Sequence, residues 1–280
     1  MSDDTSASEP TLTEYPGHWA AEDPGRPAIV MAGSGETMTF GELHEQACRI
    51  ANLFHSLGLG FGDHIAFCLE NRIEFLPLAW GAHYAGLRYT AVSSRLTADE
   101  LAYIVDDCGA RVFVTSPYKE DVLAEVTAAT PNVEVRFSIG GELPDHAPFE
   151  DAVAAQSSDA DPDWVSGTDM LYSSGTTGRP KGIMLSHDNL RKNAETLVEI
   201  WGFSASDRLL HMLPIYHVHG LFVGVSCVLM SGASMEWHPG FNDKAAIAAL
   251  PDCTVMMGVP TFYTRLLSNP DFGQECCSNV

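Results

Sequence analysis

The stretch LYSSGTTGRPKGIMLSH, from Leu171 to His187, decides how this chain is interpreted. It places three glycines, four Ser or Thr side chains before Arg179, and a single lysine between two apolar runs. Hydroxyl groups and close-lying backbone N–H groups bind anions that carry several oxygens, and a lysine adds a point charge. The stretch therefore predicts a loop that binds a polyphosphate, with a flexible surface turn as the alternative.

Two common phosphate-binding motifs do not fit this loop. A P-loop has the pattern GxxxxGK[ST] and a helix that begins at the lysine. Here Arg179 and Pro180 separate Gly178 from Lys181, Gly182 follows the lysine, and the next residues, GIMLSH, are typical of a strand. The dinucleotide pattern GxGxxG is absent as well. Neither a P-loop kinase nor a dehydrogenase is indicated.

The net charge of the chain argues against binding to nucleic acids or to anionic membranes. The 280 residues contain 15 Lys and Arg against 37 Asp and Glu, which gives a formal charge of −22. Nucleic acids and anionic membranes need a basic surface, so neither is a predicted partner. An acidic, solvated surface keeps a protein soluble; adaptation to high salt is the alternative. Any positive potential for a phosphate must come locally from Arg179, Lys181 and backbone N–H groups.

Seven scattered cysteines indicate a reducing environment. They show no C-x-x-C spacing, so neither a zinc site nor a redox pair is predicted. The first residues are acidic and polar, unlike a signal peptide. The longest apolar run, Leu221 to Met230, is too short to span a bilayer. A cytoplasmic protein without a membrane span is predicted, and its oligomeric state stays open.

Strand and helix signals alternate along the chain. Thr39 and Glu42 form a capping box before an apolar stripe that ends at Gly58, and Thr97 with Glu100 forms a second one. Further predicted elements are strands at 64–69, 87–92 and near 111–116, and helices at 73–84 and 121–130. Alternation with short connections predicts an α/β fold with mostly parallel sheets flanked by helices.

This pattern divides the chain into a tail and a folded part, and the folded part contains a connection and a second section. Residues 1–15 are expected to be a disordered acidic tail, and 16–280 to form the folded part. Between Arg136 and Arg179 eight acidic residues occur and no basic one, so 137–168 is expected to be an exposed acidic connection. A second section, 169–280, begins with strand, glycine loop, strand and helix.

Three motifs resemble the adenylate-forming superfamily, which includes acyl-CoA synthetases, peptide-synthetase adenylation domains and luciferases. They are YSSGTTGRPKG (172–182), LPIYHVHG (213–220) and TFGELHEQACRIANLFHSLG (39–58). The resemblance runs from Trp19 to Val280. It implies that residues 16–280 are an incomplete large N-terminal domain, and that the small C-terminal domain of the superfamily is absent.

The resemblance implies an ATP-dependent ligase. Such enzymes join a carboxylic acid to AMP, release pyrophosphate, and in many cases pass the acyl group to coenzyme A. The loop would bind the β- and γ-phosphates, and Mg²⁺ would neutralise further charge. Its implied ATP-binding residues are Ser173, Ser174, Gly175, Thr176, Thr177, Gly178, Arg179 and Lys181, with Lys181 also acting in catalysis.

His217 corresponds to a superfamily position near the α-phosphate and the acyl carboxylate, which implies a catalytic and substrate-binding role. His217 and His219 would share one face of an extended segment, so metal binding has to be considered. H-x-H alone is a weak signal, and a wall histidine is the alternative for His219. No metal site is predicted.

The second half of the chain resembles malonyl-CoA synthetases most, on MGVPTFYTRLL (257–267) and GASMEW (232–237). Arg265 would then bind the distal carboxylate of a dicarboxylic acid, because a guanidinium suits that geometry. The alternative is a surface arginine paired with an acidic neighbour. The first half resembles fatty- and aromatic-acid CoA ligases, so a medium-chain or aromatic acid is the alternative substrate.

Several superfamily motifs are expected beyond the last residue: a magnesium-binding glutamate, a ribose-binding aspartate, a hinge and a C-terminal lysine. One hypothesis is therefore an acid–CoA ligase fragment that is inactive alone. The other is a non-catalytic remnant that binds polyphosphate. A peptide-synthetase adenylation domain is less favoured, because no carrier domain is seen.

Overall fold

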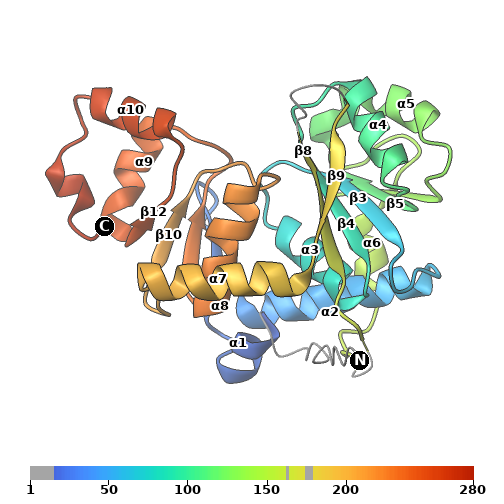
Figure 1. The fold of residues 1–280 in the computed structure, drawn as a ribbon, viewed down its shortest axis with the longest axis horizontal. Coiled ribbons are helices and arrows are strands. Elements are labelled where there is room, and N and C mark those ends of the chain that lie inside the picture. The colour runs from blue at the N-terminus through green and yellow to red at the C-terminus, as the bar shows by residue number, and fades with distance from the viewer. Residues whose placement is uncertain (1–15, 162–163, 174–178) are drawn as a thin grey trace, which may run out of the picture.

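The protein is described from a computed structural model, which covers residues 16–161, 164–173 and 179–280. Within these ranges the chain folds into two sheets with helices packed on them (Figure 1). The predicted α/β class with mostly parallel sheets is confirmed. The predicted tail, 1–15, lies outside the described residues.

The larger sheet has seven strands in the order β7-β6-β5-β3-β4-β8-β9. All neighbours are parallel except β8 and β9, which form an antiparallel pair at one edge. The strands are β3 (His64–Cys68), β4 (Arg88–Val92), β5 (Val112–Thr115), β6 (Val135–Ser138), β7 (Ala147–Pro148), β8 (Thr168–Ser173) and β9 (Lys181–Leu185).

Strand β3 shows why helices cover both faces of this sheet. Successive side chains of a strand point to opposite faces. Ile65 and Phe67 belong to one hydrophobic core together with α2 (Phe40–Ser56) and α3 (Phe75–Tyr84). Ala66 and Cys68 belong to another, with α4 (Ala98–Asp107) and α5 (Glu120–Ala129). The continuously apolar run of β3 therefore follows from burial on both faces.

Both predicted capping boxes are present. At α2 the Thr39 hydroxyl accepts from the Glu42 N–H at 3.2 Å, and the Glu42 carboxylate accepts from the Thr39 N–H at 2.8 Å. Thr97 and Glu100 make the same pair of contacts at the start of α4. These contacts satisfy N–H groups that have no partner inside the helix.

The smaller sheet has five strands in the order β12-β10-β11-β1-β2, parallel except for β1 with β2. Its strands are β1 (Pro27–Met31), β2 (Thr37–Thr39), β10 (Arg208–His211), β11 (Ser234–Trp237) and β12 (Val255–Met256). Its helices are α1 (Gly17–Glu22), α7 (His187–Trp201), the π-helical turn η2 (His219–Val225), α8 (Ser226–Ser231), α9 (Asp243–Ala249) and α10 (Pro260–Ser268). Short 3-10 turns are η1 (Pro117–Lys119), η3 (Leu250–Asp252) and η4 (Gln274–Cys277).

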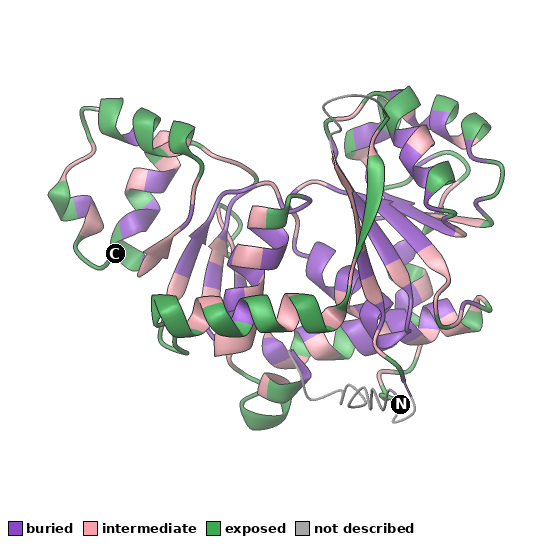
Figure 2. Ribbon diagram, viewed as in Figure 1, coloured by how far each residue is buried: buried purple, intermediate pink, exposed green. Residues whose placement is uncertain are grey.

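Side chains of β10 again divide between two cores. Leu209 packs in the core shared by the two sheets, whereas Leu210 packs with Leu250 and Leu266 below α9 and α10. Figure 2 shows buried residues concentrated in the strands, while β9 and α7 present exposed residues outward. Within the described ranges, no helix combines the length and apolarity needed to cross a membrane.

Residues 137–168, expected as an exposed connection, contain β7 and α6 between the end of β6 and the start of β8. β7 extends the larger sheet, and α6 (Phe149–Ala154) buries Phe149 and Val153, with Phe149 edge-on against Phe137. Acidic side chains of this stretch, such as Glu150 and Asp151, are exposed. The apolar residues are too sparse for a periodic signal, because only one turn of α6 packs against the sheet.

Candidate functional site

The main cavity, about 820 Å³ in volume, lies where strands of both sheets end. Its lining includes residues that follow β3, β4 and β5 of the larger sheet, namely Glu70, Ser94 and Tyr118. Residues that follow β10, β11 and β12 of the smaller sheet line the other side, namely Leu213, Pro239 and Val259. Ligands of open α/β sheets bind beyond the carboxyl ends of the strands, and this volume suits a small organic molecule.

His217 and Arg265, both predicted from sequence to bind the acid, line this same cavity. They are 48 positions apart and reach it from the turn after β10 and from α10. His219 lines it as well. The expectation that His217 and His219 share a face of an extended segment is wrong, because His219 begins the π-helical turn η2.

A tight turn places His217. Its N–H donates to the Pro214 carbonyl at 3.2 Å, and its own carbonyl accepts from the Leu221 N–H at 2.9 Å. Gly220 is needed here, because a Cβ at that position would lie 2.5 Å from the Pro214 oxygen. Burial, aided by the positive charge of Arg95, lowers the pKa of His217 below its ordinary value. The imidazole is therefore neutral at pH 7, with one nitrogen able to donate and one able to accept.

Arg265 is paired with an acidic neighbour and also lines the cavity. Its Nη2 donates to Asp243 Oδ1 at 3.2 Å, and its guanidinium lies 4.9 Å from the centre of the Phe241 ring. Phe241 stacks in turn on Phe262 at 4.0 Å. The side chain is 56% exposed and lines the cavity. Because a guanidinium has five N–H donors, the pair with Asp243 leaves several for a ligand.

Sequence analysis missed a second cation of the cavity, Arg95. It lies three residues after the end of β4, is exposed, and lines the cavity together with His217 and Arg265. Within the described part of the chain its guanidinium has no hydrogen bond or ion pair. Its position just past the carboxyl end of a parallel strand was a usable signal, since ligand contacts concentrate there.

The predicted phosphate loop begins at the same end of the larger sheet. Ser173 ends β8 and pairs with Lys181, which begins β9. Because β8 runs parallel to β4, Ser173 lies at the carboxyl end of the sheet, as Ser94 and Arg95 do. Lys181 is exposed and has no ion pair among the described residues. The other predicted loop residues, Ser174, Gly175, Thr176, Thr177 and Gly178, lie outside the described ranges.

Helix α4 holds both ends of that loop. The Tyr172 hydroxyl donates to Asp107 Oδ2 at 2.7 Å on one side. On the other side, the Tyr103 hydroxyl donates to the Pro180 carbonyl at 3.1 Å, and the Arg179 guanidinium lies 5.1 Å from the Tyr103 ring centre. Arg179, predicted to contact phosphate, is thus placed against α4. Burial and the contact with Asp107 raise the pKa of Tyr172, which keeps its hydroxyl a donor.

The described residues do not gather three or more His, Cys, Asp or Glu side chains that could hold a metal ion.

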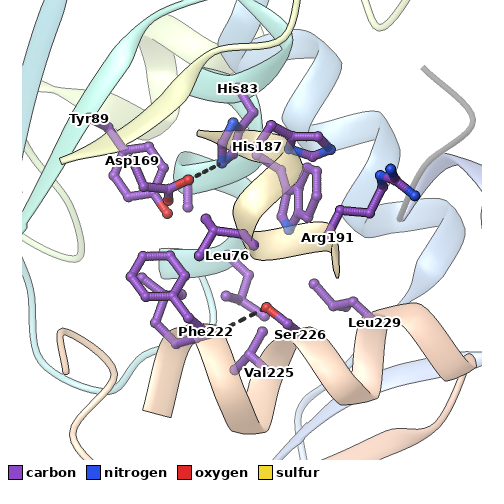
Figure 3. A pocket seen from close by; sticks show the side chains of 14 residues that line it. Leu76, His83, Tyr89, Asp169, His187, Arg191, Phe222, Val225, Ser226 and Leu229 are labelled. Atoms are coloured by element: carbon purple, nitrogen blue, oxygen red, sulfur yellow. Dashed lines mark hydrogen bonds and ion pairs between the residues drawn. The ribbon is translucent and has the colours of Figure 1, made fainter. Parts of the chain in front are cut away.

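A second cavity of about 40 Å³ lies between α3, β8, α7 and η2 (Figure 3). In it, His83 Nε2 faces Asp169 Oδ2 at 3.1 Å, with Tyr89 and His187 beside the pair. Burial alone would lower the pKa of His83, but the charge of the nearby Asp169 carboxylate outweighs it and raises the pKa. A cavity of this volume has room for a water molecule or two.

Comparison with known proteins fits this geometry. A family model described as AMP-binding enzyme matches residues 17–279. Feruloyl-CoA synthase of Amycolatopsis sp is 29% identical over 251 residues, which cover 87% of this chain and 48% of that protein. Mitochondrial malonate–CoA ligase of Homo sapiens is 28% identical over 249 residues, covering 83% and 42%.

Among solved structures, ATP-bound MatB from Rhodopseudomonas palustris superposes with a TM-score of 0.82 at 35% identity, covering 95% of this chain and 53% of that one. The chain spans about half the length of the curated relatives it matches. Because the family model covers nearly all of its residues, the chain belongs to the AMP-binding enzyme family.

Proposed function

We propose that this chain forms the ATP- and acid-binding part of an ATP-dependent carboxylic acid–CoA ligase, acting on malonate or a similar short acid. The observation that carries the proposal is the cavity that unites His217 and Arg265 at the carboxyl ends of both sheets. ATP-bound MatB, which shares this fold, and the malonate–CoA ligase relative support it. Seven free cysteines favour the cytoplasm as its location.

The proposed chemistry assigns each group a separate task. The acid's carboxylate attacks the α-phosphorus of ATP, and the bond to pyrophosphate breaks. Lys181 and the loop stabilise the negative charge of the departing pyrophosphate. Mg²⁺ bound together with ATP would supply further charge neutralisation. Neutral His217 hydrogen-bonds the acyl carboxylate or the α-phosphate. Coenzyme A then takes the acyl group and releases AMP.

Arg265 supports a dicarboxylic acid, since its free N–H donors suit a distal carboxylate. An aromatic or medium-chain acid is the second candidate substrate, and it is favoured by the aromatic side chains that line the same cavity. Tyr216, Phe241 and Phe262 line it, and feruloyl-CoA synthase is among the relatives.

Acid-dependent exchange of labelled pyrophosphate into ATP tests the proposal. Malonate, acetate, benzoate and octanoate are compared in the parent and in Arg265→Ala. We expect malonate to support the fastest exchange and Arg265→Ala to slow it by at least about tenfold, with acetate unaffected. Equal losses for malonate and acetate would contradict the distal contact. Faster exchange with benzoate or octanoate selects the second candidate. MgATP binding without exchange for any acid would show that the 280-residue chain does not catalyse adenylation by itself, as expected both of a ligase fragment that is inactive alone and of a non-catalytic polyphosphate-binding protein.

A further inference from the structure

Asn71 connects the two sheets at the main cavity. It follows β3 of the larger sheet and is 7% exposed. Its side-chain Nδ2 donates to the carbonyls of Leu213 and His238, each at 2.9 Å, and its Oδ1 accepts from the Ile215 N–H at 2.9 Å. Its partners follow β10 and β11 of the smaller sheet and lie 142 to 167 positions away.

The chemistry of this contact selects asparagine. The two carbonyls require two donors, and the Ile215 N–H requires an acceptor. A primary amide supplies both on one short side chain. Aspartate would set a carboxylate against two carbonyl oxygens, and leucine of similar size would leave three buried backbone groups without a partner.

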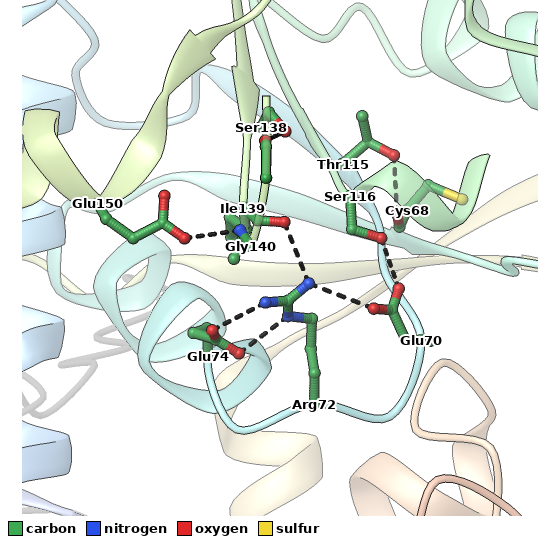
Figure 4. A network of polar contacts seen from close by, with 11 residues as sticks. Cys68, Glu70, Arg72, Glu74, Thr115, Ser116, Ser138, Ile139, Gly140 and Glu150 are labelled. Carbon is green, nitrogen blue, oxygen red and sulfur yellow. Dashed lines mark hydrogen bonds and ion pairs between the residues drawn. The ribbon is translucent and has the colours of Figure 1, made fainter. Parts of the chain in front are cut away.

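The residues on either side of Asn71 belong to a network of hydrogen bonds and ion pairs. Figure 4 shows the neighbouring Arg72 bound to Glu70, Glu74 and the Ile139 carbonyl, at 2.8 to 3.2 Å. The Ser116 hydroxyl donates to the other Glu70 oxygen at 2.6 Å. The residues on both sides of Asn71 are thereby bound to residues that follow β5 and β6, and Asn71 links segment 213–215 to this end of the larger sheet.

We propose that Asn71 is a positioning residue of the acid site, which sets the turn that holds His217 in the cavity. The step from Asn71 to His217 is short: Ile215 is bound by Asn71, and the His217 N–H bonds Pro214 within the same turn. The catalytic meaning of this role rests on the proposed function, whereas the positioning itself does not.

Asn71→Leu in the 280-residue chain tests the role, with Asn52→Leu as the matched control. Asn52 also donates from its amide to two backbone carbonyls, those of Ser157 and Asp159, but away from the cavity. Two measurements apply: histidine-labelled NMR titration, with His217→Gln to assign the signal, and hydrogen exchange of residues 212–220.

We expect Asn71→Leu to move the pKa of His217 upward toward its ordinary value, since the ring becomes more solvated. Amide exchange in 212–220 rises by at least about tenfold, while exchange in α2 and β3 stays as in the parent. Asn52→Leu changes neither. If His217 titrates as in the parent, or if exchange rises equally throughout, the positioning role is overturned.

Asn71→Ser takes the place of Asn71→Leu if the latter does not fold. If both fail to fold while Asn52→Leu folds, Asn71 is a general stability determinant and the proposal is overturned. Adding malonate with MgATP to the parent tests the proposed ligase function separately from the positioning role of Asn71. A His217 signal that responds to Asn71→Leu but not to these ligands leaves the positioning role standing and removes the proposed function.

Discussion

The His83–Asp169 pair joins α3 to the strand that leads into the phosphate loop. Asp169 is 1% exposed, and both partners are buried in the small cavity of Figure 3. A charged pair away from water is stable only while both partners keep their charges. Because the folded-state pKa of His83 is raised, folding favours the protonated imidazole, and the pair contributes stability only while that proton is bound.

The sign of the resulting pH dependence follows from that shift. The contribution is complete below the unfolded pKa of histidine, about 6.5, and is lost as the pH rises through the higher folded pKa. We predict that Asp169→Asn lowers the free energy of unfolding by about 3–5 kcal/mol at pH 6, and that its difference from the parent narrows toward pH 9. Urea unfolding at both pH values measures this.

Exposed Asp252→Asn serves as the control and should change the unfolding free energy little at either pH. A difference between Asp169→Asn and the parent that is constant from pH 6 to 9 would show that His83 does not carry the charge.

Single elements were predictable where local chemistry determines them. Helices α2 and α4 begin at the predicted capping boxes, and the apolar run 64–69 became the doubly buried β3. β1, β2 and β7 were missed: β2 and β7 have only three and two residues, β1 is buried only in part, and the pairing of such strands depends on the tertiary fold. β1, for example, pairs with β11, about 200 positions away.

The capping contact at α2 has a measurable effect. We predict that Thr39→Ala lowers the free energy of unfolding by about 1 kcal/mol, because the Glu42 N–H at the helix start loses the Thr39 hydroxyl as its acceptor. Thr37→Ala is the control: Thr37 lies two residues earlier in the same strand, and its hydroxyl bonds only the Gly35 carbonyl. Equal losses in the two variants would show that the capping box contributes nothing specific.

At the scale of the whole molecule, two sheets end at a common cavity, which no single segment encodes. The sequence predicted His217 and Arg265 as acid contacts, and the structure brings them to one cavity. Asn71, Arg95 and Glu70 escaped prediction, because their relevance depends on which strands become neighbours. Sequence periodicity indicates that a strand is buried. It does not indicate which residues, following different strands, come together at the cavity.

ATP binding by the whole molecule is the central claim. Ser173 and Lys181, which flank the loop, lie at the carboxyl end of the larger sheet, as the cavity residues Ser94 and Arg95 do. Lys181 is exposed and lacks an ion pair among the described residues. A lysine that bonds phosphate oxygens contributes affinity directly, whereas a distant surface lysine contributes only weak screening.

The most direct test is isothermal titration of the 280-residue chain with MgATP, in the parent, Lys181→Ala and Lys244→Ala. Lys244 is an exposed lysine of α9 and provides the matched control. We predict saturable binding to the parent, an affinity at least about tenfold weaker for Lys181→Ala, and parent-like affinity for Lys244→Ala. Equal affinities of the parent and Lys181→Ala, or no binding by the folded parent, would contradict the account.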